Sequence, residues 1–247
     1  MAVAPNLSRP SAVDPPIRRR IIRDAIGIGL ATGAYAVAFG ASAATSGFGT
    51  AKAAALSALM FTGGSQIALV SVIAAGGTGA AALAVAWVLG VRNGLYAVRL
   101  RSTLPEPIGR RLAAAHVVID ESMAMSAARA DASEARLAFW ATGLSIFVLW
   151  NFGTLIGATA THLIADPNRY GLDVAFPAVF LALIWPQIRD RPTIVTAVAA
   201  AVIALVLIPV APAGVPILAA AVGAGFGMAA AAGNRVAGGR RPARVEP

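Results

Sequence analysis

Long stretches without a charged residue constrain this chain more than any other feature of its sequence. Five such stretches cover residues 25–51, 53–91, 137–165, 174–188 and 192–234. A helix needs about 20 apolar residues to cross the hydrocarbon core of a bilayer, so the last stretch is long enough for two crossings. Only 13% of the residues are charged, about half of the share found in soluble domains. The sequence therefore predicts an integral membrane protein.

The basic residues lie between these stretches. A net charge of +9 would also fit a nucleic-acid-binding protein, but such a protein gathers its charge on one face of a soluble domain. Short cytoplasmic loops of membrane proteins are instead enriched in Lys and Arg. We therefore expect the basic clusters to face the cytoplasm, namely 18–23, 99–111, 129–136, 189–191 and 235–244.

The sequence contains few of the residues and motifs that an enzyme site requires. It has no cysteine, which excludes disulfides, thiolate metal sites and cysteine nucleophiles. Its two histidines, His116 and His162, are far apart, so we expect no metal site. Hydrolase and P-loop signatures are absent, and GAGFG at 223–227 lacks the third glycine of a dinucleotide motif. We therefore expect neither an enzyme nor a bound cofactor.

The apolar pattern predicts an all-α fold, a polytopic integral-membrane helical bundle of about seven to eight transmembrane or re-entrant segments. We expect one membrane domain over 24–232, between disordered basic tails at 1–23 and 233–247. The expected helices lie near 24–45, 53–75, 79–100, 137–160, 173–188, 193–209 and 214–232. The stretch 112–128 is the candidate for an eighth.

The orientation of the first half poses a problem. Three full crossings before 99–111 would place the arginines of this cluster outside the cytoplasm, against the positive-inside tendency. We therefore expect one segment not to cross, and 53–75 is the candidate because polar residues interrupt it. The stretch 112–128, with basic residues on both sides, would likewise dip into the membrane rather than span it. The alternative is that the tendency, being statistical, does not hold here.

The interruption is the sequence FTGGSQIAL at 61–69, where Gly63, Gly64, Ser65 and Gln66 follow one another. Because glycine weakens a helix interior by about 1 kcal/mol, we predict a break in helical hydrogen bonding within 61–66. Its backbone groups would then face a cavity and bind a small zwitterion. The alternative is close helix packing, which glycine and serine allow. A faint similarity between 49–65 and 171–187 hints at an internal repeat with discontinuous helices.

Charged groups also lie within or beside the apolar segments. Arg92 stands inside 79–100, with Asn93 next to it and Tyr96 one turn later on the same face. Asp120 and Glu121 form the only acidic pair in an apolar context. Each charge alone costs several kcal/mol at depth, so we predict that Arg92 faces one cavity with these carboxylates. The alternatives are an arginine at the cytoplasmic end of its helix and an interfacial helix for 112–128.

Asn151 follows Trp150 in a helix that also contains Gly153 and Gly157, and for these glycines we favour a packing role. The candidate substrate-binding residues are Gly63, Gly64, Ser65, Gln66, Arg92, Asn93, Tyr96, Asp120, Glu121 and Asn151.

Five motifs in this order resemble the AzlC family of branched-chain amino acid permeases: FTGGSQ at 61–66, VRNGLYA at 91–97, DES at 120–122, WNFGT at 150–154 and GLDVAFPAVFLAL at 171–183. The resemblance covers about 24–232. It places the family's Gly-Gly-x-Gln element on Gly63, Gly64 and Gln66. The family's arginine corresponds to Arg92, and the family's acidic pair corresponds to Asp120 and Glu121. Relatives often have Asn where this chain has Gly90 and His where it has Asn93.

The resemblance implies a multi-pass protein of the bacterial inner membrane that exports branched-chain amino acids or their analogues. It also implies a partner, a small hydrophobic membrane subunit of the AzlD family, beside which this chain is the large subunit. No ATP-binding motif is present, so the energy would come from an ion gradient or from the substrate's own gradient. The alternatives are a scaffold or assembly subunit that does not transport, and an exporter of a different small solute.

Overall fold

The computed structural model describes residues 13–101, 103–104, 107–161, 181, 185 and 188–238. Every regular element within these ranges is a helix, which confirms the all-α prediction. The chain divides into two compact units, one formed by residues 1–66 and 89–172 and the other by 67–88 and 173–247. Each unit is described by itself below.

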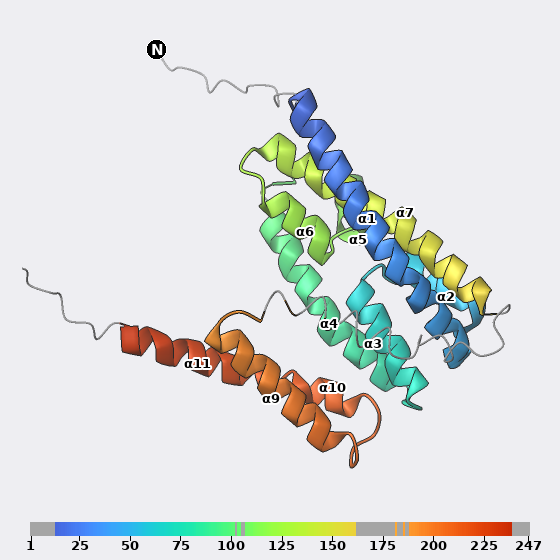
Figure 1. Ribbon diagram of the computed structural model, residues 1–247, viewed down its shortest axis with the longest axis vertical. Coiled ribbons are helices and arrows are strands. Elements are labelled where there is room, and N and C mark those ends of the chain that lie inside the picture. Colours follow the sequence, from blue (N-terminus) through green and yellow to red (C-terminus); the bar gives the residue numbers. More distant parts are fainter. Residues whose placement is uncertain are drawn as a thin grey trace, which may run out of the picture. The chain divides into compact units, whose positions relative to one another are not determined.

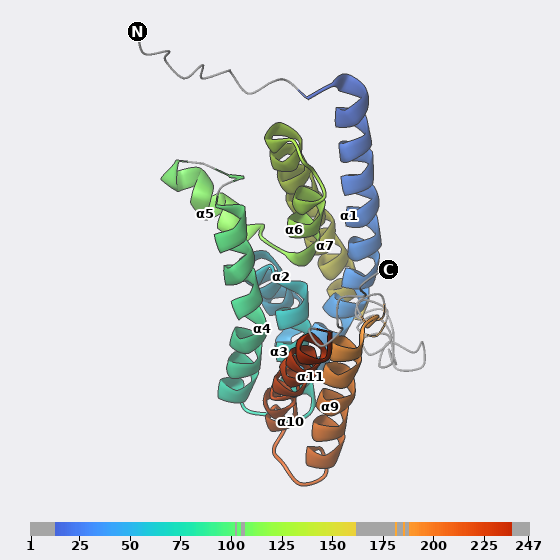
Figure 2. The same ribbon diagram turned by 90° about the vertical axis from the view of Figure 1, so that its left-hand side faces the viewer.

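The first unit is built around two long helices. Helix α1 (Pro15–Ala43) and helix α7 (Ala132–Ala160) lie side by side along most of their length (Figures 1 and 2). A Cβ atom added to Gly40 would overlap the carbonyl oxygen of Thr154, and one added to Gly157 would overlap that of Val37. The glycines therefore let the two backbones touch. This confirms the packing role that the sequence indicated for Gly157.

Helix α1 continues through a kink at Ala44–Phe48 into helix α2 (Gly49–Met60). Gly47 and Gly49 have positive φ angles of 90° and 66° at this kink, a region that glycine enters without steric cost. Helix α2 also packs against α7, where the hydroxyl groups of Ser57 and Thr154 hydrogen bond at 3.2 Å.

Two expected segments of this unit are each interrupted. Helix α2 ends at Met60 and helix α3 (Gly63–Ala74) begins three residues later. The stretch 112–128 contains most of α5 (Ile108–His116) and all of α6 (Asp120–Ala127), which are joined by buried, non-helical residues 117–119. Helix α4 (Gly79–Leu100), whose residues from 89 onward belong to this unit, runs unbroken.

The second unit contains α9 (Arg191–Leu207), α10 (Val215–Ala220) and α11 (Gly223–Gly238), grouped together in Figure 1. Asp190 caps α9 by accepting a hydrogen bond of 2.8 Å from the Thr193 backbone N–H. Hydrogen bonds from the side chain and backbone of Thr193 lower the pKa of this exposed carboxyl group. The sequence predicted one helix over 214–232, but this range contains α10 and the first part of α11.

Helices extend into both of the ranges that the sequence assigned to basic tails. Residues 15–23 belong to α1, which Pro15 and Pro16 begin because proline's fixed φ suits the first helical turn. Arg20 and Asp24, one turn apart, add an ion pair at 3.9 Å. At the other end, α11 continues to Gly238. The helix expected over 173–188, and with it the second half of the proposed repeat, lies mostly outside the described residues.

Length and hydropathy mark three of the described helical segments as able to cross a membrane: Pro15–Met60, Gly79–Leu100 and Ala132–Ala160. The apolar helices α3 and α9 are shorter, with 12 and 17 residues. A 12-residue helix is only about 18 Å long, so α3 cannot cross the hydrocarbon core on its own.

Candidate functional site

An ion pair joins α4 to the start of α6. Arg92 Nη1 lies 2.9 Å from Asp120 Oδ2, and the two side chains are 39% and 43% exposed. The Nε of Arg92 and the Oδ1 of Asp120 are buried and form no hydrogen bond within the described part of the chain. The prediction that Arg92 lies close to one of these carboxylates is confirmed for Asp120. A cavity shared with both carboxylates stays a prediction.

The guanidinium group of Arg92 also lies against the first turn of α3. A Cβ atom added to Gly64 would be 2.9 Å from Arg92 Nη2, so a glycine here leaves room for the charged group. The first amides of a helix have no acceptor within that helix and carry partial positive charge. Arg92 and the start of α3 together form a region that attracts an anion.

The acidic residues occupy the start of the other interrupted segment. Asp120 and Glu121 form the first turn of α6, where the positive end of the helix dipole stabilises negative charge. Ser122 holds this interruption together, because its hydroxyl donates to Val117 O at 2.8 Å and accepts from the Ile119 N–H at 3.0 Å. The site therefore presents a cationic and an anionic group side by side.

Two tyrosines lie near these charges. Tyr96, one helical turn after Arg92, places its side chain beside the Asp120 carboxylate. Tyr35 of α1 is half-buried and lies within electrostatic range of Asp120 and Glu121. The sequence singled out Tyr96 from its spacing, whereas nothing in the sequence around Tyr35 links it to an acidic pair 85 residues away.

The break between α2 and α3 confirms the predicted interruption within 61–66, but its position differs in detail. Phe61 and Thr62 leave the helical conformation, while Gly63 and Gly64 begin α3. The Gln66 Nε2 group donates to the carbonyl oxygens of Leu56 at 2.9 Å and Ser57 at 3.3 Å. Of these two carbonyls, Ser57 O belongs to the last four of α2, which have no partner within the helix. The amide of Gln66 therefore partly satisfies this helix end.

His116 closes the same helix end from α5. Its Nε2 lies 2.9 Å from Ala58 O, and because a carbonyl oxygen accepts, Nε2 is the donor. The imidazole ring also packs against Phe61 and Phe147, whose centroids are 6.1 Å and 5.5 Å away and which contact each other. His116 therefore joins the two interrupted segments to each other.

The buried Ser65 completes the first turn of α3. Its side chain is 1% exposed, and its Oγ, like the Oε1 of Gln66, has no hydrogen-bond partner among the described residues. A Cβ atom on Gly90 of α4 would lie 3.8 Å from this Oγ. Buried polar atoms without partners carry an energetic penalty, so they mark α3's first turn as a place where a polar ligand would be stabilised.

Not every predicted residue points to this site. Asn151 donates from Nδ2 to Phe147 O in its own helix at 2.8 Å, and Asn93 is half-buried. Two residues of α7 reach the interruption instead. The Phe147 ring contacts Phe61, and the Trp150 ring would lie 3.1 Å from a Cβ on Gly63. Its ring also contacts Tyr35 edge-on, at a centroid distance of 5.1 Å. The motif WNFGT contains Trp150, but nothing in the local sequence links its apolar ring to the site.

The arrangement defines a class of protein: a helical membrane protein whose polar site is built where helices are interrupted. A binding site of this kind is typical of transporters. No group of acidic or histidine side chains that would hold a metal ion occurs within the described ranges.

A family comparison makes the assignment more specific. The model of the family described as AzlC protein matches residues 27–164, which is more than half of the chain, and the chain belongs to this family. The AzlC family is associated with branched-chain amino acid transport. The matched range contains the interruption, Arg92 and the acidic pair. A search of curated proteins and a search of solved structures each found no match.

Proposed function

We propose that this chain is a secondary transporter that exports branched-chain amino acids or their analogues across the bacterial inner membrane. The observation that carries the proposal is the position of Arg92, which pairs with Asp120 at the start of α6 and lies against Gly64 at the start of α3. One cation thereby links two interrupted segments, each of which presents a helix N-terminus.

The mechanism follows from competition for this ion pair. The carboxylate of the amino acid binds Arg92 and the free amides of α3's first turn, both of which favour an anion. Its ammonium group binds Asp120 or Glu121. The aliphatic side chain lies against apolar residues at the interruption, among them Trp150. Because the substrate replaces one ion pair by two, its binding separates α4 from α6.

The partner in this proposal is a small hydrophobic membrane subunit of the AzlD type, with this chain as the large subunit. The chain would cross the membrane several times, and the broken segments α2/α3 and α5/α6 would enter it without each forming a full crossing. In support, α5 and α6 have only nine and eight residues, too few to span about 30 Å of hydrocarbon.

An efflux assay tests the proposal. Cells that lack their own exporters are loaded with leucine, isoleucine or valine through dipeptides, and intracellular amino acid is followed with and without expression of this chain and its small partner. We expect faster efflux of these three amino acids than of glycine or lysine, and resistance to toxic analogues. Equal efflux with and without the pair, at matched membrane levels, would leave a scaffold or assembly subunit as the function.

A further inference from the structure

A cavity in the first unit is lined by residues other than those of the Arg92 site. It has a volume of about 340 Å³ and is enclosed by the end of α4, the following residue Leu104 and α5. Most of its wall is apolar, with Ala97, Ala114 and Val118 among the contributing residues. None of its lining residues belongs to the candidate substrate site. A volume of this size is sufficient for part of an organic ligand.

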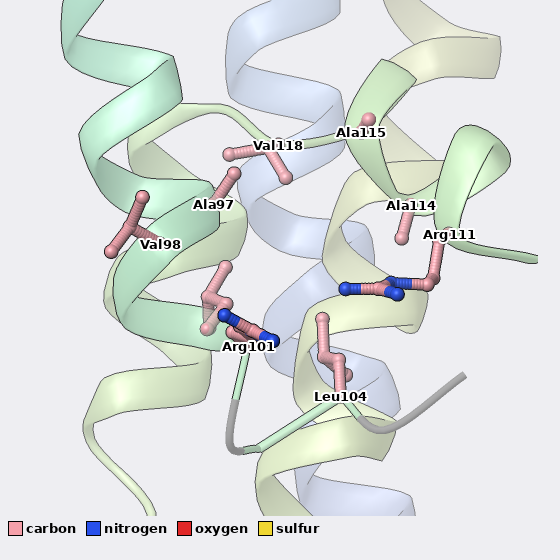
Figure 3. A pocket seen from close by; sticks show the side chains of 9 residues that line it. Ala97, Val98, Arg101, Leu104, Arg111, Ala114, Ala115 and Val118 are labelled. Atoms are coloured by element: carbon pink, nitrogen blue, oxygen red, sulfur yellow. The ribbon is translucent and has the colours of Figure 1, made fainter. Parts of the chain in front are cut away.

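Two arginines give this cavity its charge. Arg101, at the end of α4, and Arg111, on α5, both direct their guanidinium groups into the space between the two helices (Figure 3). Neither forms an ion pair or a hydrogen bond with a residue that the structure describes. None of the described residues that line this cavity is acidic. Two cations directed into the same space repel, so the geometry favours an anion between them. Guanidinium groups bind phosphate in a bidentate manner.

The exposed side chains of α4 indicate where this helix lies in the membrane. Val91, Leu95 and Val98 lie on one face of this helix and are 57%, 67% and 73% exposed. They form an apolar stripe that suits lipid, and Arg101 follows Val98 by three residues. With 22 residues, α4 is about 33 Å long, which matches the roughly 30 Å of a hydrocarbon core. Arg101 therefore lies where the hydrocarbon ends and the headgroups begin.

Helix α5 has the composition of an interfacial helix. Its Ile108 and Leu112, one turn apart, are 73% and 69% exposed, while Arg111 lies next to Leu112 and lines the cavity. Exposed large apolar side chains beside basic ones are typical of helices that lie in the plane of the headgroups. The cavity thus opens at the depth where a phospholipid carries its phosphate.

We propose that this cavity binds an anionic phospholipid, whose phosphate lies between Arg101 and Arg111 and whose acyl chains follow the apolar stripe of α4. The lipid then links α5 to the end of α4. This inference is independent of the transported substrate, because it uses none of the residues of the Arg92 site. A free phosphate ion would satisfy the arginines but not the apolar wall, and the experiment separates the two.

The purified protein is stripped of lipid in detergent and titrated with phosphatidylglycerol or phosphatidylcholine, and bound lipid is counted by native mass spectrometry. We expect phosphatidylglycerol to bind more tightly. The double variant Arg101→Gln/Arg111→Gln should weaken its binding about 30-fold, since each basic residue near an anionic surface contributes roughly a factor of five. The variant Arg101→Lys/Arg111→Lys keeps both charges but lacks the planar forks, so its affinity should lie between those of the unmodified protein and the Gln double variant.

Two further variants make the test specific. Arg18→Gln/Arg19→Gln removes the same charge from the exposed start of α1 and should leave phosphatidylglycerol binding unchanged. Ala115→Leu enlarges a side chain that lines the cavity and should weaken lipid binding while both arginines remain. Circular dichroism and size-exclusion chromatography confirm that each variant is folded.

The proposal is wrong if Arg101→Gln/Arg111→Gln binds phosphatidylglycerol as the unmodified protein does, or if the α1 double variant loses as much. It is also wrong if millimolar inorganic phosphate displaces the lipid completely and Ala115→Leu has no effect. That result would assign the arginines to a free anion.

Discussion

The two long helices α1 and α7 and the two interrupted segments α2/α3 and α5/α6 use the same small residues for opposite purposes. In the long pair, Gly40 and Gly157 bring two unbroken backbones into contact. In α3, Gly63 and Gly64 begin a helix after a break and leave space for Trp150 and Arg92. Glycine in a membrane helix therefore indicates packing or interruption according to what lies opposite it, which is a property of the fold.

This comparison separates stability from function. Substitutions between α1 and α7 should reduce the amount of folded protein, whereas substitutions at the interruptions should reduce transport while the protein remains folded. The variants below test this division, from the largest expected effect to the smallest.

Arg92→Ala should lower export at least about 100-fold, because it removes charged hydrogen bonds worth roughly 1.5–3 kcal/mol each from the site. Arg92→Lys should restore little, since lysine lacks the planar fork that binds a carboxylate in a bidentate manner. The measurement is initial efflux rate at matched membrane levels. Normal export by Arg92→Ala would mean that the ion pair is structural and that the proposed site is wrong.

Gly40→Ala should destabilise the protein by about 1–3 kcal/mol, because the added methyl group meets the backbone of α7 and cannot be accommodated without a shift. Gly27→Ala, in the same helix, is the matched control because its Cβ meets nothing within 4 Å. Thermal unfolding in detergent measures both. An unchanged melting temperature for Gly40→Ala would show that the α1/α7 contact is looser than described.

Gly64→Ala should lower export about tenfold, since a shift of the reacting or binding groups by about 1 Å is enough for such losses. The new methyl group would meet the end of the flexible Arg92 side chain rather than backbone, so the melting temperature should change little. Gly94→Ala, with open space around its Cβ, controls for the added methyl group. Loss of folded protein instead of transport would remove the distinction between the two regions.

Gln66→Leu should destabilise the protein by about 1–2 kcal/mol, because the carbonyl groups of Leu56 and Ser57 lose their donor at nearly constant side-chain volume. If the role of Gln66 is to hold the interruption, the apparent KM for substrate should stay within about twofold. A large rise in the apparent KM without a change in stability would indicate that Gln66 binds the substrate directly.

Asn151→Ala should have the smallest effect, less than about 0.5 kcal/mol in stability and less than twofold in export, because its amide donates to Phe147 O in its own helix. The adjacent Trp150→Leu is the comparison, since Trp150 is buried against the start of α3. Export below half the unmodified rate in Asn151→Ala would place this residue in the site after all.

The sequence alone was sufficient for the class of fold and for the central pair. Uncharged stretches predict membrane helices because a charge in hydrocarbon costs several kcal/mol, and this applies wherever the segment packs. The same cost predicts that Arg92 should meet a carboxylate, and Asp120 lies 2.9 Å away. Consecutive glycines predict a break for a local reason, the weakness of glycine in a helix.

The tertiary structure decided what each polar side chain contacts. Gln66 and His116 satisfy the end of α2, Asn151 turns to its own helix, and Tyr35 and Trp150 approach the site from α1 and α7. The physical reason is that the partner of a hydrogen-bonding group depends on which helices pack together. Which helices pack together depends on residues far apart in the chain, and the local periodicity of the sequence does not predict it.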